Sequence, residues 1–129
     1  MHVRSMKLLV LLSLVVLGGC TTVYPNTTAG SGTYNRASGW LSWAYPVPLE
    51  RSYQATLVAL ERLDLRIQTK TLDGLEGRIK AIRADRTTVK VYLKPLTDRT
   101  TEVKVKIGTF GDQEQAEYIH KNIRAQLQL

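Results

Sequence analysis

Apolar and polar residues alternate strictly in two neighbouring segments of this chain of 129 residues. In residues 87–94 (Thr-Thr-Val-Lys-Val-Tyr-Leu-Lys) and 101–107 (Thr-Glu-Val-Lys-Val-Lys-Ile), every second residue is Val, Leu, Ile or Thr. Because successive side chains of a β-strand point to opposite faces of a sheet, the pattern predicts antiparallel strands with one buried face and one wet face. The rest of the chain must then cover the buried face.

Two amphipathic segments are predicted to be helices that supply this cover. The first is residues 49–63, where apolar residues recur at helical spacing: Leu49, Tyr53, Leu57, Leu60 and Leu63. The second is expected to begin after Asp112, which forms a capping box with Gln115. Its apolar stripe is Ala116, Ile119, Ile123 and Leu127.

Three further strands complete the predicted sheet. Residues 65–72 and 75–83 are joined at Asp73-Gly74, a pair typical of two-residue hairpin turns. Residues 40–47 are β-prone and contain Pro46, which cannot donate to a ladder, so this segment is expected to be an edge strand or to end there. The prediction is an α+β fold, a five-stranded antiparallel sheet with two helices packed on one face (β-α-β-β-β-β-α).

The N-terminal segment has the composition of an export signal. A basic start precedes ten mostly apolar residues, 8–17, which are too few to span a bilayer as a helix. Leu17-Gly18-Gly19-Cys20 resembles a lipobox, which implies cleavage between Gly19 and Cys20, diacylation of the Cys20 thiol and acylation of the new amino terminus. An ordinary signal peptide, or a core helix with an incidental cysteine, is the alternative, and translation from Met1 or Met6 fits equally well.

These signals predict three parts: a lipoprotein signal peptide (1–19), a lipidated cysteine with a flexible tether (20–39) and one small α+β domain (40–129). The tether is rich in Thr, Ser, Gly and Asn. Removing Arg4 and Lys7 with the signal would lower the formal net charge from +7 to +5. This moderate basicity favours anionic neighbours, and export argues against nucleic acid as a partner.

Several segments resemble an uncharacterised family of small bacterial lipoproteins, a domain of unknown function. The resemblance rests on the lipobox and on 53–60, 75–79, 94–96 and 105–112, and its most specific part is Gly-Thr-Phe-Gly-Asp at 108–112. Pro48 departs from the family, whose members tend to have a serine there as the helix cap. The resemblance implies an envelope location and this fold, but no activity.

Catalytic and metal sites are not expected. His120 is the one histidine of the mature chain, and only Glu117 is placed to share its helix face, whereas zinc needs three or four ligands. No serine occupies a nucleophile elbow. The turn at 108–112 could cradle an anion, but Asp112 already supplies negative charge there, so a turn and helix cap is favoured. We expect no enzyme, no metal and no cofactor.

The wet face of the sheet is the best candidate site. If the alternation holds, eight cations on four adjacent strands point outward together: Arg66, Lys70, Arg78, Lys80, Lys90, Lys94, Lys104 and Lys106. Like charges opposite one another destabilise a sheet, so the face either binds an anionic surface or is a solvated face that keeps the protein soluble. Both interpretations remain open on the sequence.

The leading hypothesis is a non-enzymatic envelope lipoprotein that is anchored to a membrane through Cys20 and acts by binding. One version is an accessory subunit of an envelope protein complex, which would use the Trp40/Trp43 edge strand or the sheet face. The alternative is a binder of anionic lipid head groups or glycan phosphates through the basic face. Thr21 follows Cys20, and in a Gram-negative cell the absence of aspartate there suggests the outer membrane, facing the periplasm.

Overall fold

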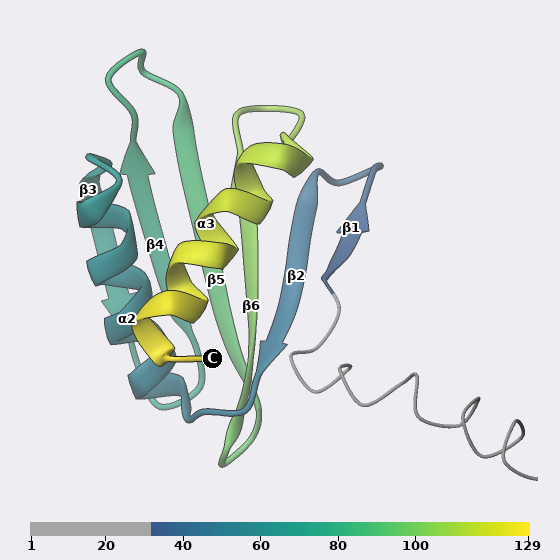
Figure 1. Cartoon of the computed structure of the whole chain (residues 1–129), viewed down its shortest axis with the longest axis vertical. Coiled ribbons are helices and arrows are strands. Elements are labelled where there is room, and N and C mark those ends of the chain that lie inside the picture. The colour runs from purple at the N-terminus through teal and green to yellow at the C-terminus, as the bar shows by residue number, and fades with distance from the viewer. Residues whose placement is uncertain (1–31) are drawn as a thin grey trace, which may run out of the picture.

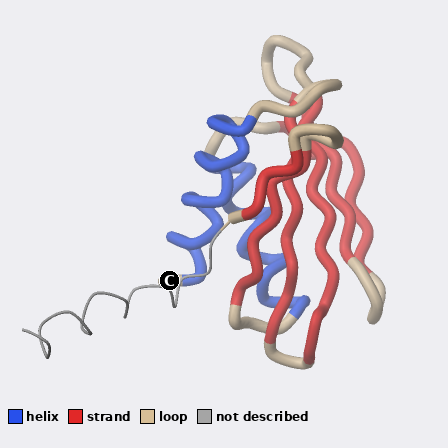
Figure 2. Tube along the Cα trace, turned by 90° about the vertical axis from the view of Figure 1, so that its right-hand side faces the viewer, coloured by secondary structure: helices blue, strands red, loops and turns tan. Residues whose placement is uncertain are grey.

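The computed structural model describes residues 32–129, which form one antiparallel sheet covered on one face by two helices (Figures 1 and 2). The elements in chain order are β1 (Thr33–Asn35), β2 (Trp40–Tyr45), α2 (Leu49–Arg62), β3 (Arg66–Leu72), β4 (Gly77–Ile82), β5 (Thr88–Thr97), β6 (Thr100–Ile107) and α3 (Gln113–Leu127). The strand order across the sheet is β1-β2-β6-β5-β4-β3. The α+β fold with an open antiparallel sheet is therefore confirmed, whereas the expected number of five strands is wrong, because the sheet has six.

The additional strand is β1, which lies within the segment predicted as a tether. It pairs with the first three residues of β2, so β2 is not the outermost strand there. The Asn35 side chain accepts hydrogen bonds from the backbone N–H groups of Ala37 (2.9 Å) and Ser38 (3.1 Å), and the Gly39 N–H donates to the Asn35 carbonyl (2.7 Å). The turn between β1 and β2, in a segment rich in small polar residues, is therefore stabilised by the Asn35 side chain. Pro46 follows the last residue of β2, as expected.

The Gly-Thr-Phe-Gly-Asp segment joins β6 to α3 and packs against the β1–β2 turn. Gly111 has a φ of +86°, and a β-carbon at this position would collide with the backbone of Gly39. Both the left-handed conformation and the close approach therefore require glycine. The Asp112 side chain then accepts a hydrogen bond from the Gln115 N–H (3.1 Å) and caps α3. The turn-and-cap interpretation of this segment agrees with these contacts.

The core lies between the sheet and the helices. The inward side chains of the central strands are buried, including Ile79, Val91, Leu93, Val103 and Val105. From α3 the predicted stripe of Ala116, Ile119, Ile123 and Leu127 is buried against them.

Helix α2 is rotated relative to its predicted stripe. Its buried residues are Ser52, Tyr53, Ala55, Thr56, Ala59 and Leu60, whereas Leu57 is only half-buried. The inward face of α2 carries the small side chains of Ser52, Ala55 and Ala59. Small side chains let the helix backbone lie closer to the elements it packs against than leucines would. Leucine spacing alone does not reveal this, because α2 packs against α3 as well as against the sheet.

The β3–β4 connection is longer than the predicted two-residue turn. Strand β3 ends at Leu72 and β4 begins at Gly77, which leaves a four-residue loop. The Asp73 carboxylate accepts hydrogen bonds from the N–H groups of Leu75 (2.7 Å) and Glu76 (2.9 Å). Asp73 therefore closes the loop through its side chain, as aspartate commonly does in turns.

Candidate anion-binding face

The face of the sheet opposite the helices, here called the outer face, carries seven of the eight cations that the alternation placed together. Directly opposed residues of an antiparallel pair share a face, and the pairing connects the outward positions of β4, β5 and β6. The outward cations are Arg66, Arg78, Lys80, Lys90, Lys94, Lys104 and Lys106.

Lys70 lies on the other face. The register between β3 and β4 shifts between Ile67 and Thr69, so Thr69 pairs with Lys80 and Lys70 pairs with the buried Ile79. The additional residue of a β-bulge reverses the alternation beyond it. Lys70 therefore lies on the helix side of an edge strand, where it is exposed, and its predicted membership of the basic face is wrong.

Three lysines form a row across the centre of the outer face. Lys80 on β4 is directly opposite Lys90 on β5, and Lys90 is directly opposite Lys106 on β6. Opposed side chains begin about 5 Å apart at their β-carbons, where like charges destabilise the pair. Within residues 32–129, no carboxylate lies within ion-pair distance of any of these three ammonium groups. We call these residues the lysine row.

The next row along the strands is more neutral. Arg78 forms an ion pair with Glu76 (3.0 Å) and its guanidinium lies 5.4 Å from the centre of the Tyr92 ring. The Tyr92 hydroxyl donates a hydrogen bond to the other oxygen of Glu76, which raises the pKa of Tyr92. The charge of Arg78 is therefore balanced by Glu76, and Tyr92 is held in one orientation. Lys104 lies opposite Tyr92 on β6.

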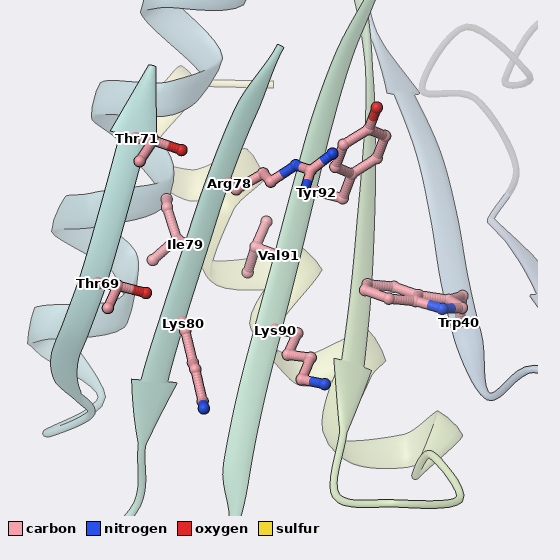
Figure 3. A pocket seen from close by; sticks show the side chains of 9 residues that line it. All are labelled: Trp40, Thr69, Thr71, Arg78, Ile79, Lys80, Lys90, Val91 and Tyr92. Carbon is pink, nitrogen blue, oxygen red and sulfur yellow. The ribbon is translucent and has the colours of Figure 1, made fainter.

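Two hollows flank the lysine row and both include Lys80 and Lys90. One, of about 520 Å³, contains Trp40, Tyr92, Thr69 and Thr71 among its lining residues, as Figure 3 shows. The other hollow, of about 530 Å³, is lined mainly by further basic and hydroxyl-bearing residues: Lys106, Arg86, Thr87, Thr88 and Thr109, with Gly108. Neither hollow contains an acidic side chain. The site is therefore shallow, cationic and rich in hydroxyl groups.

One family comparison bears on this chain. The family described as "Protein of unknown function (DUF3568)" matches residues 5–126. The chain belongs to this family. The match covers both the folded region and the segment around Cys20, and none of the curated proteins matches the sequence. Family membership agrees with the resemblance to a domain of unknown function and assigns no activity.

Sequence reasoning missed several residues of the site in this DUF3568 member. Tyr92 was assigned only to a strand, and Trp40 only to an edge strand that could contact a protein partner, although both occupy outward positions in phase with the lysines. Their alternation was the available signal. Arg86 belongs to the β4–β5 turn and has a φ of +73°, so no strand periodicity could have predicted its place beside the lysine row. Arg83 in the same turn is paired with Asp85 (3.0 Å).

The other sequence candidates lie elsewhere. His120 is fully buried, not a surface or half-buried residue, and Glu117 is exposed and hydrogen-bonded to Gln113. The described residues contain no group of three or more His, Cys, Asp or Glu arranged to hold a metal ion. Between residues 32 and 129, no helix has the length and apolar character needed to cross a membrane. Gly19 and Cys20 lie outside the described residues.

His120 is a neutral core residue with a defined tautomer. Its Nε2 lies 3.0 Å from the Leu41 carbonyl, which can only accept, so Nε2 carries the hydrogen. Nδ1 then accepts from the Tyr45 hydroxyl (2.6 Å). Burial lowers the pKa of His120 to about 4, and the nearby Arg124 acts in the same direction. The histidine thus ties α3 to β2 and has no open coordination position.

Acid should destabilise the fold through His120. The folded-state pKa of about 4 lies below the ordinary value of 6.5, so the unfolded state binds the proton more readily. The contribution of neutral His120 to the free energy of unfolding is fully present above pH 6.5 and is lost as pH falls towards 4. The shift corresponds to about 3 kcal/mol. Urea unfolding across this range, compared with His120→Leu, isolates the effect from carboxylate titration; equal pH dependence in the two proteins would contradict it.

Proposed function

We propose that this protein is a membrane-anchored envelope lipoprotein that acts by binding anionic, phosphate-bearing molecules on its outer face. The observation that supports the proposal best is the lysine row, in which Lys80, Lys90 and Lys106 are directly opposed and lack a carboxylate partner among the described residues. An anion placed over the row would convert mutual repulsion into shared attraction.

The fold does not require this arrangement. The helices bury the opposite face of the sheet, and the core is complete without any contribution from the lysine row. Lys80 and Lys90 are exposed and Lys106 is half-buried, so other polar residues would also fit these positions. The two like-charged pairs each cost a fraction of a kcal/mol. Lysine is a compact charge that suits phosphate and carboxylate groups. The chemistry of the face is therefore that of an anion-binding surface.

The proposed anchor is compatible with a site close to a membrane. Thirteen residue steps separate Cys20 from the start of β1, which allow at most about 45 Å even when fully extended. The family match includes the segment around Cys20. Anionic lipids and phosphorylated glycans both occur within this distance of an envelope membrane. In a Gram-negative cell we place the protein on the periplasmic side of the outer membrane.

An accessory role in an envelope protein complex is the second candidate. It is favoured by Phe110, a residue that is 87% exposed in the loop that packs on the β1–β2 turn. A large exposed aromatic residue is typical of interface anchors. If the outer face ignores anions even at low salt, this second function becomes the better interpretation.

Removing the lysine row should strongly weaken anion binding without affecting the fold. We expect the Lys80→Gln, Lys90→Gln, Lys106→Gln triple variant to bind inorganic tripolyphosphate about 100-fold more weakly, because each lysine near an anion contributes about 1 kcal/mol. The full chain is titrated calorimetrically in a neutral detergent at low salt. Binding by the unchanged protein should weaken steeply at higher salt, where the screening length shortens.

A matched control separates the site from net charge. Lys70→Gln, Arg51→Gln and Lys121→Gln remove the same three charges from exposed positions away from the outer face. This control should retain binding within about threefold, which is less than 1 kcal/mol. Equal losses in the two triple variants would show that tripolyphosphate senses only overall charge, and the proposal would fail.

A further inference from the structure

We propose that the ligand of the outer face is a phosphate-bearing saccharide, whose phosphate lies on the lysine row and whose sugar ring lies against Trp40. This inference rests on the proposed function and adds the chemical class of the ligand. It follows from the different chemistry of the two hollows that meet at Lys80 and Lys90.

Each of the two hollows suits a different part of the proposed ligand. The hollow next to Arg86 and Lys106 offers cations and hydroxyl groups, which suit phosphate oxygens. The hollow next to Trp40 and Tyr92 offers aromatic rings, with the exposed hydroxyls of threonines on β3. Since Lys80 and Lys90 line both hollows, one phosphate-bearing sugar can contact the two hollows together. An inorganic anion would contact only the hollow next to Arg86 and Lys106.

Trp40 has the position needed for a stacking platform. It precedes Leu41, which pairs with Val105, and its indole lies on the same side of the sheet as Lys90 (Figure 3). The ring is half-buried, which limits its motion while leaving part of it accessible. The negative π face of an indole attracts the weakly positive C–H face of a sugar ring. A lipid phosphate alone would leave this ring unused.

Polar groups around the aromatic hollow match sugar hydroxyls. Thr69 and Thr71 are both on the outer face because the bulge in β3 reverses the alternation. Each hydroxyl can donate one hydrogen bond and accept others. Tyr92 is held by Glu76 and Arg78, so its ring forms a fixed wall at little entropic cost on binding. A few polar groups on an aromatic surface are the usual composition of small-molecule sites.

The test compares glucose 1-phosphate, inorganic phosphate and glucose, titrated into the full chain in a neutral detergent without a sugar head group. We expect glucose 1-phosphate to bind about three- to tenfold more tightly than inorganic phosphate, as one aromatic contact allows. Trp40→Ala should remove this difference and leave phosphate affinity unchanged, whereas Trp40→Phe should keep part of it. Tyr118→Ala, an exposed aromatic on α3, is the matched control and should change nothing.

The outcomes separate this inference from the proposed function. Equal affinity for glucose 1-phosphate and phosphate, both lost when the lysine row is removed, would overturn the saccharide inference and leave the anion-binding function standing. Tighter binding of adenosine monophosphate would assign the platform to nucleobases and also overturn it. So would binding to phosphatidylglycerol vesicles that is stronger than sugar-phosphate binding and independent of Trp40. No binding of any anion at low salt would reject both proposals.

Discussion

Cys20→Ser should accumulate as an unprocessed precursor that incorporates no acyl label, while the unchanged protein is fully labelled and shortened. The expectation rests on Leu17-Gly18-Gly19-Cys20 and on Cys20 being the only thiol in the chain. The lipid is expected on the sulfur atom, and an unactivated serine hydroxyl is a much weaker nucleophile than a cysteine thiol at neutral pH. Metabolic labelling with a clickable fatty acid, followed by gel mobility and membrane fractionation, measures both steps.

A conservative change two residues after the cysteine provides the control. Thr22→Ser leaves the lipobox intact and should be labelled, processed and membrane-bound like the unchanged protein. Two or more acyl chains make anchoring stable, whereas one chain is marginal, so the fraction recovered with membranes should fall sharply for Cys20→Ser. Normal maturation and membrane retention of Cys20→Ser would exclude lipidation at this residue.

Ile123→Ala should destabilise the domain by about 2–5 kcal/mol, the usual cost of truncating a large buried aliphatic side chain. Ile123 is fully buried where α3 packs against the sheet. Leu57→Ala should cost less, because Leu57 is half-buried on the rotated face of α2. Urea unfolding of both variants gives the comparison. Equal losses, or an Ile123→Ala protein that unfolds like the unchanged one, would show that the described core is incorrect.

Local patterns predicted the elements whose environment is uniform along their length. Strands β5 and β6 lie inside the sheet with one face buried, so alternation identified them and their outward lysines. Helix α3 has a side-chain cap and a single apolar stripe, and both were evident from the sequence. In these elements each residue's surroundings follow from its position in a repeat.

The sequence was a poor guide where pairing decides the structure. Strand β3 is an edge strand with almost every residue exposed, so it shows no alternation from which a bulge could be inferred. Lys70 was therefore assigned to the wrong face. Strand β1 has three residues and depends on β2 for its existence. The burial of His120 depends on acceptors and donors at Leu41 and Tyr45, far away in the chain.

The candidate site was predicted in part for the same reason. The outward cations of β4, β5 and β6 follow from alternation, but their alignment into the lysine row depends on the register between strands. Turn geometry brings Arg86 beside the row, and the relation of Trp40 to β6 comes from long-range pairing. The alternation of residues along a strand predicts which face of the sheet a side chain lies on. It does not predict which residues of the adjacent strands lie beside it.

Amide NMR spectra of the full chain, recorded while tripolyphosphate is added at low salt, test most directly the claim that the outer face binds anions. We predict saturable shifts centred on Lys80, Lys90 and Lys106, with neighbouring changes at Arg86 and little change along α2. Shifts concentrated on the helices, or no saturable shift anywhere, would contradict the claim.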